Sequence, residues 1–363
     1  MASNKNQHYV PQCYLKNFSI DKSKAAICVY NLDRKKLIKN APIKNQCSRN
    51  YFYGEDLALE KALQPIEGQF SEIVRTIEEP NYTLTKKDES FLKHFWLLQY
   101  LRTEAASKRN VELVEELKNT TDVPELKMEL KEAVQQSMRT FFQIKNIVND
   151  LKVCIFRNET NTSFITSDDP AVLTNRWHLL DRKAGFQSFG LRSAGNLLVL
   201  PLTPKLLMLA YDADVYYVPN IRQWVKLKNS FDIDSFNYLQ ILHCRANLYT
   251  EATNSLQYLE CLHNRVVDIK PAQSHKINYA VLDKMDDDTK TFKVVDFAEA
   301  KEHEVALIHC QPVNVAPPTW PRCINYKHRG FMMTDGSALG FVRKARVNDF
   351  GKSGFYKVLI QKG

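Results

Sequence analysis

NLLVLPLTPKLLMLAYD, residues 196–212, is the most hydrophobic stretch of the chain and decides its fold class. Two prolines, a threonine and a lysine interrupt it, so it falls short of the ~20 consecutive apolar residues that a membrane-spanning helix needs. Short apolar runs bounded by such residues are typical of buried strands. We therefore predict two paired strands here, NLLVLPLTP and KLLMLAYD, in a protein that does not enter a membrane.

The sequence before this stretch predicts a hairpin and then a helical block. AAICVYNLD and KKLIKNAPI read as two strands that turn at Asp33-Arg34. Apolar residues then recur three and four apart through residues 56–150, which indicates helices. We expect helices over 59–77 with a kink at Pro65, from Asp88 through 109, over 111–118, and from Pro124 to about 150. The helix after Asp88 is apolar nearly all round, so we expect it to be central.

The sequence around and after the stretch predicts further strands. KVCIFRN and SFITS are expected to be strands, and FNYLQILHCRANLYTEA and SLQYLECLHNRV are expected to be helices. After Pro271, six short β-like runs alternate with turns: INYAVLD, TFKVVDF, EVALIHC, GFMMTD, ALGFVRK and FYKVLIQ. The predicted class is α+β: a helix-rich body packed on a small, mostly antiparallel sheet, with a C-terminal β-rich appendage. We predict a core domain over residues 1–270, with mixed α/β structure over 151–270, and an extension over 271–363.

Charge and cysteine content narrow the setting. The net charge is +9, and residues 1–50 and 322–363 carry +8 and +7 of it, so the two ends could recognise phosphates. No dense Lys/Arg block is present, however, and a solvated surface explains the charge equally simply. The eight cysteines form no CxxC pair, which fits reduced thiols better than disulfides or a zinc site. We predict a cytoplasmic protein.

HYVP, residues 8–11, is the first candidate site motif. A histidine can act as a general acid or base near neutral pH, and Pro11 favours the first turn of a following helix. His8 and Tyr9 could equally serve packing, with the imidazole bonded to a backbone carbonyl. The residues alone favour packing.

Glu67 and Arg102 form the second candidate. Glu67 lies at the margin of an apolar helical stripe, where a carboxylate needs a partner. Arg102 lies on the central helix, one turn after Gln99, and could supply that partner. The pair could hold two helices together, or it could line a pocket for an anionic substrate.

TSDDPAV supplies the third candidate, and the helix after Ile233 supplies the fourth. Asp168 and Asp169 follow an apolar strand, where magnesium-binding carboxylates and Asp-Pro turns both occur. Because adjacent strand residues point to opposite faces, only one of the two should face a given site. A polar stripe of Asn237, Gln240, Cys244 and Asn247 either bonds the neighbouring backbone or lines a cleft, and His243 lies off this stripe.

Six motifs in order make the chain resemble a known family. They are HYVPQCYLKNF, LEKALQPIE, LKHFWLLQYLRT, FITSDDP, LPLTP and FNYLQILHCRANLY, which together span about residues 6–250. This order resembles a large, mostly bacterial family of uncharacterised proteins, a domain of unknown function often called "HYVP". The resemblance implies no activity. It marks signature positions that include His8, Glu67, Arg102, Asp168 and Asp169. The chain departs from the family pattern at Asp169, where many members have Asn, which puts a need for this carboxylate in doubt.

These residues allow two hypotheses. In the first, the chain is a nuclease-like hydrolase or a transferase that acts on a phosphate-bearing substrate such as nucleic acid or nucleotide. His8, Glu67 and Asp168 would be catalytic, Glu67 and Asp168 would hold a divalent metal such as Mg²⁺, and the substrate would contact Tyr9, Gln99, Arg102 and Asn237. In the second, the same residues form a buried network in a non-catalytic binding module, with a protein partner on residues 271–363. GxGxxG, GxxxxGK[ST], GxSxG and HExxH motifs are absent from the sequence, which disfavours the site types that they mark.

Overall fold

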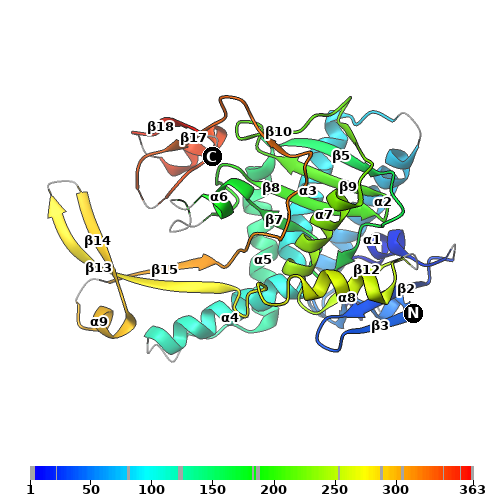
Figure 1. The fold of residues 1–363 in the computed structure, drawn as a ribbon. Helices are drawn as coiled ribbons and strands as arrows, with labels where there is room; N and C mark the ends of the chain where they lie inside the picture. Colours follow the sequence, from blue (N-terminus) through cyan, green and yellow to red (C-terminus); the bar gives the residue numbers. More distant parts are fainter. Residues whose placement is uncertain are drawn as a thin grey trace.

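The computed structural model describes residues 5–360, apart from residues 22, 80–81, 122–125, 182–183, 185–188, 252–253, 287–288, 304–305, 338 and 352. A five-stranded sheet in the order β11-β5-β9-β8-β7 forms its centre (Figure 1). Its strands are β5 (Lys152–Asn158), β7 (Val172–Thr174), β8 (Leu197–Thr203), β9 (Leu206–Tyr211) and β11 (Trp224–Leu227). The predicted pair in the hydrophobic stretch is confirmed, because β8 and β9 pair antiparallel. Strand β11 runs parallel to β5.

Both faces of this sheet are covered, which explains why its strands are apolar throughout rather than alternating. Val153 and Ile155 of β5 pack into a cluster with helices α2, α3 and α5, whereas Cys154 and Phe156 pack into a second cluster with α7. The helices of the first cluster are α2 (Ala58–Glu78), α3 (Lys86–Arg102) and α5 (Leu130–Ile144). Helix α4 (Glu104–Thr121) packs on α5. Helix α7 (Ser230–His243) lies on the opposite face of the sheet.

Helix α3 is central, as predicted. Thr85 caps its first turn by accepting a bond from the Asp88 backbone N–H, and Asp88 bonds the Thr85 N–H in return. The buried Trp96 indole donates to the Val199 carbonyl of β8 at 3.1 Å. The interior of α3 therefore has both apolar and polar anchors to the sheet.

A second sheet, in the order β3-β2-β12-β6, lies beside α7 and α8 (Leu256–Asn264). The predicted hairpin of β2 (Ala26–Asn31) and β3 (Lys36–Pro42) is confirmed. The other two strands are β6 (Thr166–Ser167) and β12 (Asn247–Thr250). Two short strands, β1 (Asn6–His8) and β4 (Ser48–Asn50), pair with each other. The short α-helices are α1 (Gln12–Leu15) and α6 (Arg176–Leu180). The 3-10 helices are Lys16–Phe18, Ile43–Asn45, Lys145–Val148 and Lys344–Phe350.

After α8, the chain forms an arm and then a lobe. The arm, residues 275–312, contains β13 (His275–Asp286), β14 (Thr289–Val295), α9 (Phe297–Lys301) and β15 (Ala306–Pro312), and it projects from the body (Figure 1). The C-terminal lobe, residues 322–360, pairs β16 (Asn325–Tyr326) with β10 (Tyr216–Tyr217) of the body, and β17 (Phe331–Thr334) with β18 (Tyr356–Leu359). The buried Arg343 joins this lobe to Asp150 and to the Ile147 carbonyl.

The α+β class is confirmed, and several local predictions are wrong. The helix expected from Asp88 through residue 109 ends at Arg102, and α4 begins at Glu104 rather than at residue 111. The helix expected through residue 252 ends at His243, and residues 247–250 form β12, so Asn247 is not on the helical stripe. ALGFVRK contributes only an isolated bridge at Val342 before a 3-10 helix. Pro65 lies inside α2, which continues to Glu78, and the kink expected there stays a prediction. Helix α5 begins at Leu130, and its expected start at Pro124 lies outside the described residues. Within the described residues, no helix is long and apolar enough to cross a membrane.

Candidate functional site

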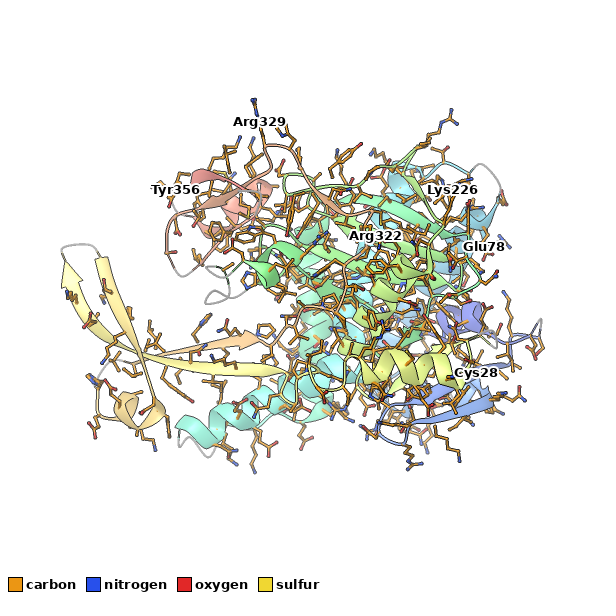
Figure 2. All side chains as sticks on the ribbon, viewed as in Figure 1. Cys28, Glu78, Lys226, Arg322, Arg329 and Tyr356 are labelled. Carbon is orange, nitrogen blue, oxygen red and sulfur yellow. The ribbon has the colours of Figure 1, made fainter. Side chains whose placement is uncertain are left out.

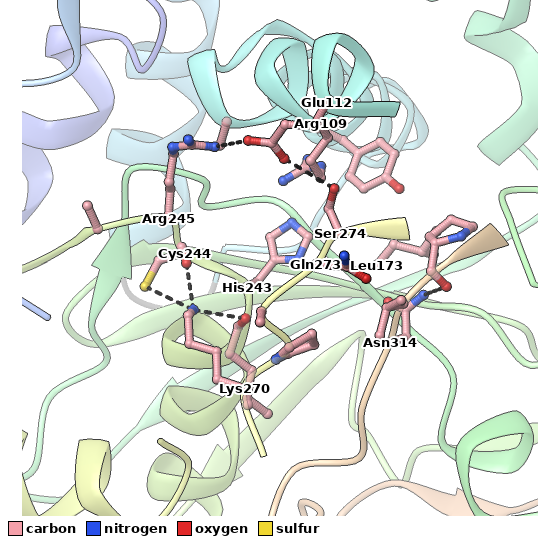
Figure 3. Close-up of a pocket in the computed structure, with 18 of the residues that line it drawn as sticks. Arg109, Glu112, Leu173, His243, Cys244, Arg245, Lys270, Gln273, Ser274 and Asn314 are labelled. Carbon is pink, nitrogen blue, oxygen red and sulfur yellow. Dashed lines mark hydrogen bonds and ion pairs between the residues drawn. The ribbon is translucent and has the colours of Figure 1, made fainter. Parts of the chain in front are cut away.

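The α7 pocket is a cavity of about 430 Å³ at the C-terminal end of α7 (Figure 3). One wall comes from α3 and α4, through Tyr100, Arg109 and Glu112. The floor is the end of α7 and the turn that follows it, residues 242–246, and the rim comes from residues 270–274 and 312–314. Segments far apart in sequence thus converge on one polar hollow of a size that suits a small molecule.

Asp169 lies behind the pocket, and its carboxylate contacts a guanidinium and an imidazole. Its side chain is fully buried, and its Oδ2 pairs with Arg109 and lies 3.2 Å from His243 Nε2. The contact between His243 Nε2 and Asp169 Oδ2 is close, but its geometry is not that of a hydrogen bond. Thr103 Oγ1 donates to the other carboxylate oxygen at 2.7 Å. Burial opposes ionisation, but Arg109 and His243 outweigh it and hold the pKa of Asp169 well below its usual range.

His243 is positioned on both sides. The Tyr100 ring stacks on its imidazole, with centroids 6.5 Å apart and an interplanar angle of 15°. The side chain keeps 19% of its surface exposed and lines the pocket. Figure 3 shows the imidazole projecting from the end of α7 into this pocket. An imidazole that touches a buried carboxylate and meets solvent can accept and return a proton.

The backbone beneath the pocket is clamped by two charged side chains. The Asp168 carboxylate accepts bonds from the backbone N–H groups of Arg245, Ala246 and Asn247, each at 2.9 Å. The Lys270 ammonium donates to the carbonyls of residues 241, 242 and 244, which are left without helical partners at the end of α7. Burial raises the pKa of Asp168, and the three N–H groups oppose this rise without cancelling it.

The rim carries a smaller ionic network. Glu112 of α4 pairs with Arg245 at 3.0 Å and accepts a bond from Ser274 at 3.3 Å. The Ser274 hydroxyl also lies 3.0 Å from His275 Nδ1. Burial, and then the charge of Arg109, lower the pKa of His275. These contacts connect the base of the arm to α4.

The first residues that the sequence singled out form a different cluster. Arg102 is fully buried and donates to Tyr53 Oη at 2.8 Å, to the His8 carbonyl at 2.9 Å and to Glu67 at 3.0 Å. The His8 imidazole points elsewhere, with Nε2 at 3.2 Å from the Lys44 carbonyl. The structure therefore brings Glu67, Arg102 and the His8 backbone together. Asp168 makes its own bonds to residues 245–247.

The predicted substrate-binding residues also have structural partners, with one exception. Tyr9 packs against Phe52, with ring centroids 5.2 Å apart. Asn237 accepts from the Ile165 N–H and donates to the Ser163 carbonyl, each at 3.0 Å, so it joins α7 to the chain before β6. Gln99 is buried, and its amide has no partner among the described residues.

Sequence reasoning missed Arg109 and His243, two of the three side chains that contact Asp169. Arg109 was not singled out and His243 was set aside, because helical periodicity cannot show what faces a residue from another element. The available signal was the Asp168-Asp169 pair, whose side chains contact different partners although both residues follow β6 rather than lie on it. Among the described residues, no group of three or more His, Cys, Asp or Glu side chains could hold a metal ion. The divalent-metal role expected of Glu67 and Asp168 stays a prediction.

Comparison with known proteins gives a family but no activity. A family model described as "Protein of unknown function (DUF4238)" matches residues 6–254. No curated protein and no solved structure matches the chain. The matched region contains the Asp169 network and the end of α7, whereas the rim residues 270–274 and 312–314 lie beyond it.

Proposed function

The chain belongs to the DUF4238 family, and we propose that it is a hydrolase or transferase that acts on a phosphate-bearing substrate in the α7 pocket. The observation that carries this proposal is the shared Asp169 oxygen. One fully buried carboxylate contacts both Arg109 and His243 beside a polar cavity. This places a proton-transfer group next to a cation that can bind an anion.

The pocket residues divide the chemistry between them. Among the described residues, Arg109 and Arg245 each bond a protein carboxylate through one terminal nitrogen, which leaves further N–H groups for phosphate oxygens. His243 would take a proton from a water molecule or an acceptor hydroxyl while the oxygen of that water or hydroxyl attacks phosphorus. It would then return that proton to the leaving oxygen as the phosphorus–oxygen bond breaks. Asp169 would stabilise the transient imidazolium, because its carboxylate stays ionised.

Two broader features support this proposal. The net charge of +9 favours association with polyanions such as nucleic acid. The eight cysteines are all free, which supports a reducing compartment such as the cytoplasm.

A panel of nucleotides, single-stranded oligonucleotides and phosphate monoesters, with and without Mg²⁺, tests the proposal. We expect His243→Gln to lower turnover by about 10²–10⁴-fold, the usual contribution of a positioned acid or base. His8→Gln is the matched control, because it removes an imidazole from the other cluster. Equal turnover by the His243 variant and the parent would contradict the proposal, and so would a parent that turns over nothing in the panel. Loss of turnover only in the His8 variant would return catalysis to His8, Glu67 and Asp168.

The second candidate is a non-catalytic binding module, and the geometry of Arg102 favours it for the first cluster. This guanidinium is fully buried and has three protein partners, so in this conformation it presents no surface to a substrate. We infer that His8, Glu67 and Arg102 hold the N-terminal segment against α2 and α3. Ligand binding without turnover in the panel would support a binding module.

A further inference from the structure

A second cavity, of about 950 Å³, lies at the edge of the central sheet that β11 forms. Its lining comes from β5, β10, β11, the turn before β11 and residues 82–83 before α3. We call it the Trp224 cavity, after the tryptophan that lines it. Among the described residues, it shares none with the α7 pocket. Figure 2 shows Lys226, another of its lining residues, at the outside of the body.

The lining of the Trp224 cavity is basic. Among its described residues, Arg157, Arg222 and Lys226 stand against one carboxylate, that of Glu159, which gives a net charge of +2. Lys226 pairs with Glu159 at 3.1 Å, but 66% of the lysine side chain stays exposed. Within the described part of the chain, neither arginine guanidinium forms a hydrogen bond or an ion pair. Both guanidinium groups can therefore bind the oxygens of an anion such as phosphate.

Aromatic rings line the same cavity. Trp224 is half-buried, and its indole N–H donates to the Tyr82 carbonyl at 2.8 Å. The Arg157 guanidinium lies over the Trp224 ring, 4.6 Å from the ring centroid. Tyr217 of β10 also lines the cavity and is 58% exposed. Aromatic rings and arginine guanidinium groups both stack on nucleobases, and cations beside such rings are the combination that single-strand binders use.

The turn before β11 has an uncommon backbone conformation. Ile221 and Trp224 exchange two backbone hydrogen bonds, at 2.9 and 3.0 Å, around Arg222 and Gln223. Both central residues have positive φ, +49° and +69°, as in the tight hairpin turns that Asn-Gly normally forms. The Gln223 side chain donates to Glu89 of α3, which anchors the turn. Non-glycine residues with positive φ are costly and cluster at ligand sites, and here they hold Arg222 and the 81% exposed Ile221 at the cavity.

We propose that the Trp224 cavity binds single-stranded nucleic acid. The bases stack on Tyr217 and on the Arg157–Trp224 pair, and Arg222 binds the phosphates. The exposed ring favours a nucleic acid over an acidic peptide, because aspartate and glutamate side chains offer no aromatic surface for stacking. It favours a single strand over a duplex, because a duplex keeps its bases stacked inside its own helix. This binding is separate from the α7 pocket and needs no turnover there.

Fluorescence anisotropy of a labelled oligothymidylate of about 16 nucleotides tests the stacking contact. We expect Tyr217→Ala to weaken binding by about 5–100-fold, the usual effect of removing one ring that stacks on a base. Tyr356→Ala is the matched control, because this tyrosine of the C-terminal lobe is 54% exposed. Figure 2 shows Tyr356 well away from Lys226. The control variant should bind as the parent does.

The same titrations at several salt concentrations test the phosphate contact. Arg222→Gln should weaken binding and lower the slope of log affinity against log salt by about 0.7, as expected when a single strand loses one phosphate contact. Arg329→Gln is the matched control, because Arg329 is exposed and also has a positive φ, +55°. Both substitutions thus place glutamine in the same backbone region, and the Arg329 variant should keep the affinity and the slope of the parent.

Several results would overturn the proposal. A parent that does not bind the oligothymidylate at low salt removes the site. An abasic phosphodiester of the same length that binds equally well removes base stacking, and polyglutamate that competes equally well assigns the cavity to an acidic peptide instead. Parent-like binding by Tyr217→Ala, or an equal loss in Tyr356→Ala, places the contact elsewhere. Far-UV circular dichroism melts confirm that each variant is folded, which is expected because the substituted side chains are exposed. The α7 pocket is tested by turnover, so the two proposals fail separately.

Discussion

Breaking the Arg109–Asp169 pair should destabilise the protein unequally, depending on which partner is removed. Asp169 is fully buried, whereas the Arg109 side chain keeps 23% of its surface exposed. Arg109→Met leaves a buried carboxylate without its nearest cation, which should lower the free energy of unfolding by about 3–5 kcal/mol. Asp169→Asn leaves an arginine that water can still reach, so its cost should be smaller, about 2–3 kcal/mol.

Urea denaturation of the parent, both single variants and the double variant measures these costs and the coupling between the residues. The surface pair of Arg49 and Glu104 is the matched control. Arg49 is 53% exposed there, so Arg49→Met should cost less than about 1 kcal/mol. The pair should also respond to pH. Because the folded-state pKa of Asp169 is lowered, its contribution is full above about pH 4 and is lost as the pH falls through the folded-state pKa.

The order of the two costs is the decisive result. If Asp169→Asn costs more than Arg109→Met, the buried carboxylate is not the group that depends on its partner. If both cost less than about 1 kcal/mol, the pair is effectively solvated, and Asp169 cannot orient His243 as proposed. A difference between parent and Asp169→Asn that grows as the pH falls below 4 would contradict the direction of the pKa shift.

Three further predictions concern the surrounding structure. Arg102→Met should lower the free energy of unfolding by about 3 kcal/mol in urea titrations, because two buried acceptors and the half-buried Glu67 carboxylate lose their donor. A cost under about 1 kcal/mol would contradict that network. Lys270→Met should cost about 2 kcal/mol by the same assay, because three carbonyls at the end of α7 lose their cation, whereas Lys226→Met at an exposed pair should be nearly neutral. Burial lowers the pKa of His8, so the folded protein should lose stability as the pH falls below about 6.5, where the imidazole protonates in the unfolded chain. His8→Gln should make the free energy of unfolding depend less on pH in this range. An unchanged pH dependence would contradict the lowered pKa of His8.

The local elements were predictable where one periodicity held over a whole element. The stripe of α2, the all-round apolar surface of α3 and the apolar runs of β8 and β9 each indicated the correct element. The boundary between α7 and β12 was not predictable in this way, because Leu248 and Tyr249 continue a plausible helical pattern. Asp168 stabilises the turn between them, and it lies 77 residues before Arg245. A helix that ends because of a distant carboxylate has no signal in its own sequence.

The candidate site was predictable in part for the same reason. The pairing of Glu67 with Arg102 was correctly expected. Asp168 and Asp169 do have different partners, but they follow β6 rather than alternate along it. The identity of the partners of Asp169 depends on how α4 and α7 pack against β6, which no local pattern records. The sequence also assigned Arg109 to the end of the preceding helix, whereas it lies on α4 and pairs with Asp169.

The pocket combines a floor from the family region with a rim from the segment that follows it. Asp169, Arg109 and His243 lie within residues 6–254, and Asp168 holds the turn after α7 within the same region. Lys270, which clamps the end of α7, and the rim residues at the base of the arm lie outside it. A chain that ended near residue 254 would therefore keep the carboxylate, the imidazole and the guanidinium, but it would lose one clamp and the rim. The later segment thus supplies the rim and one clamp of a pocket whose other charged and titratable groups come from the family region.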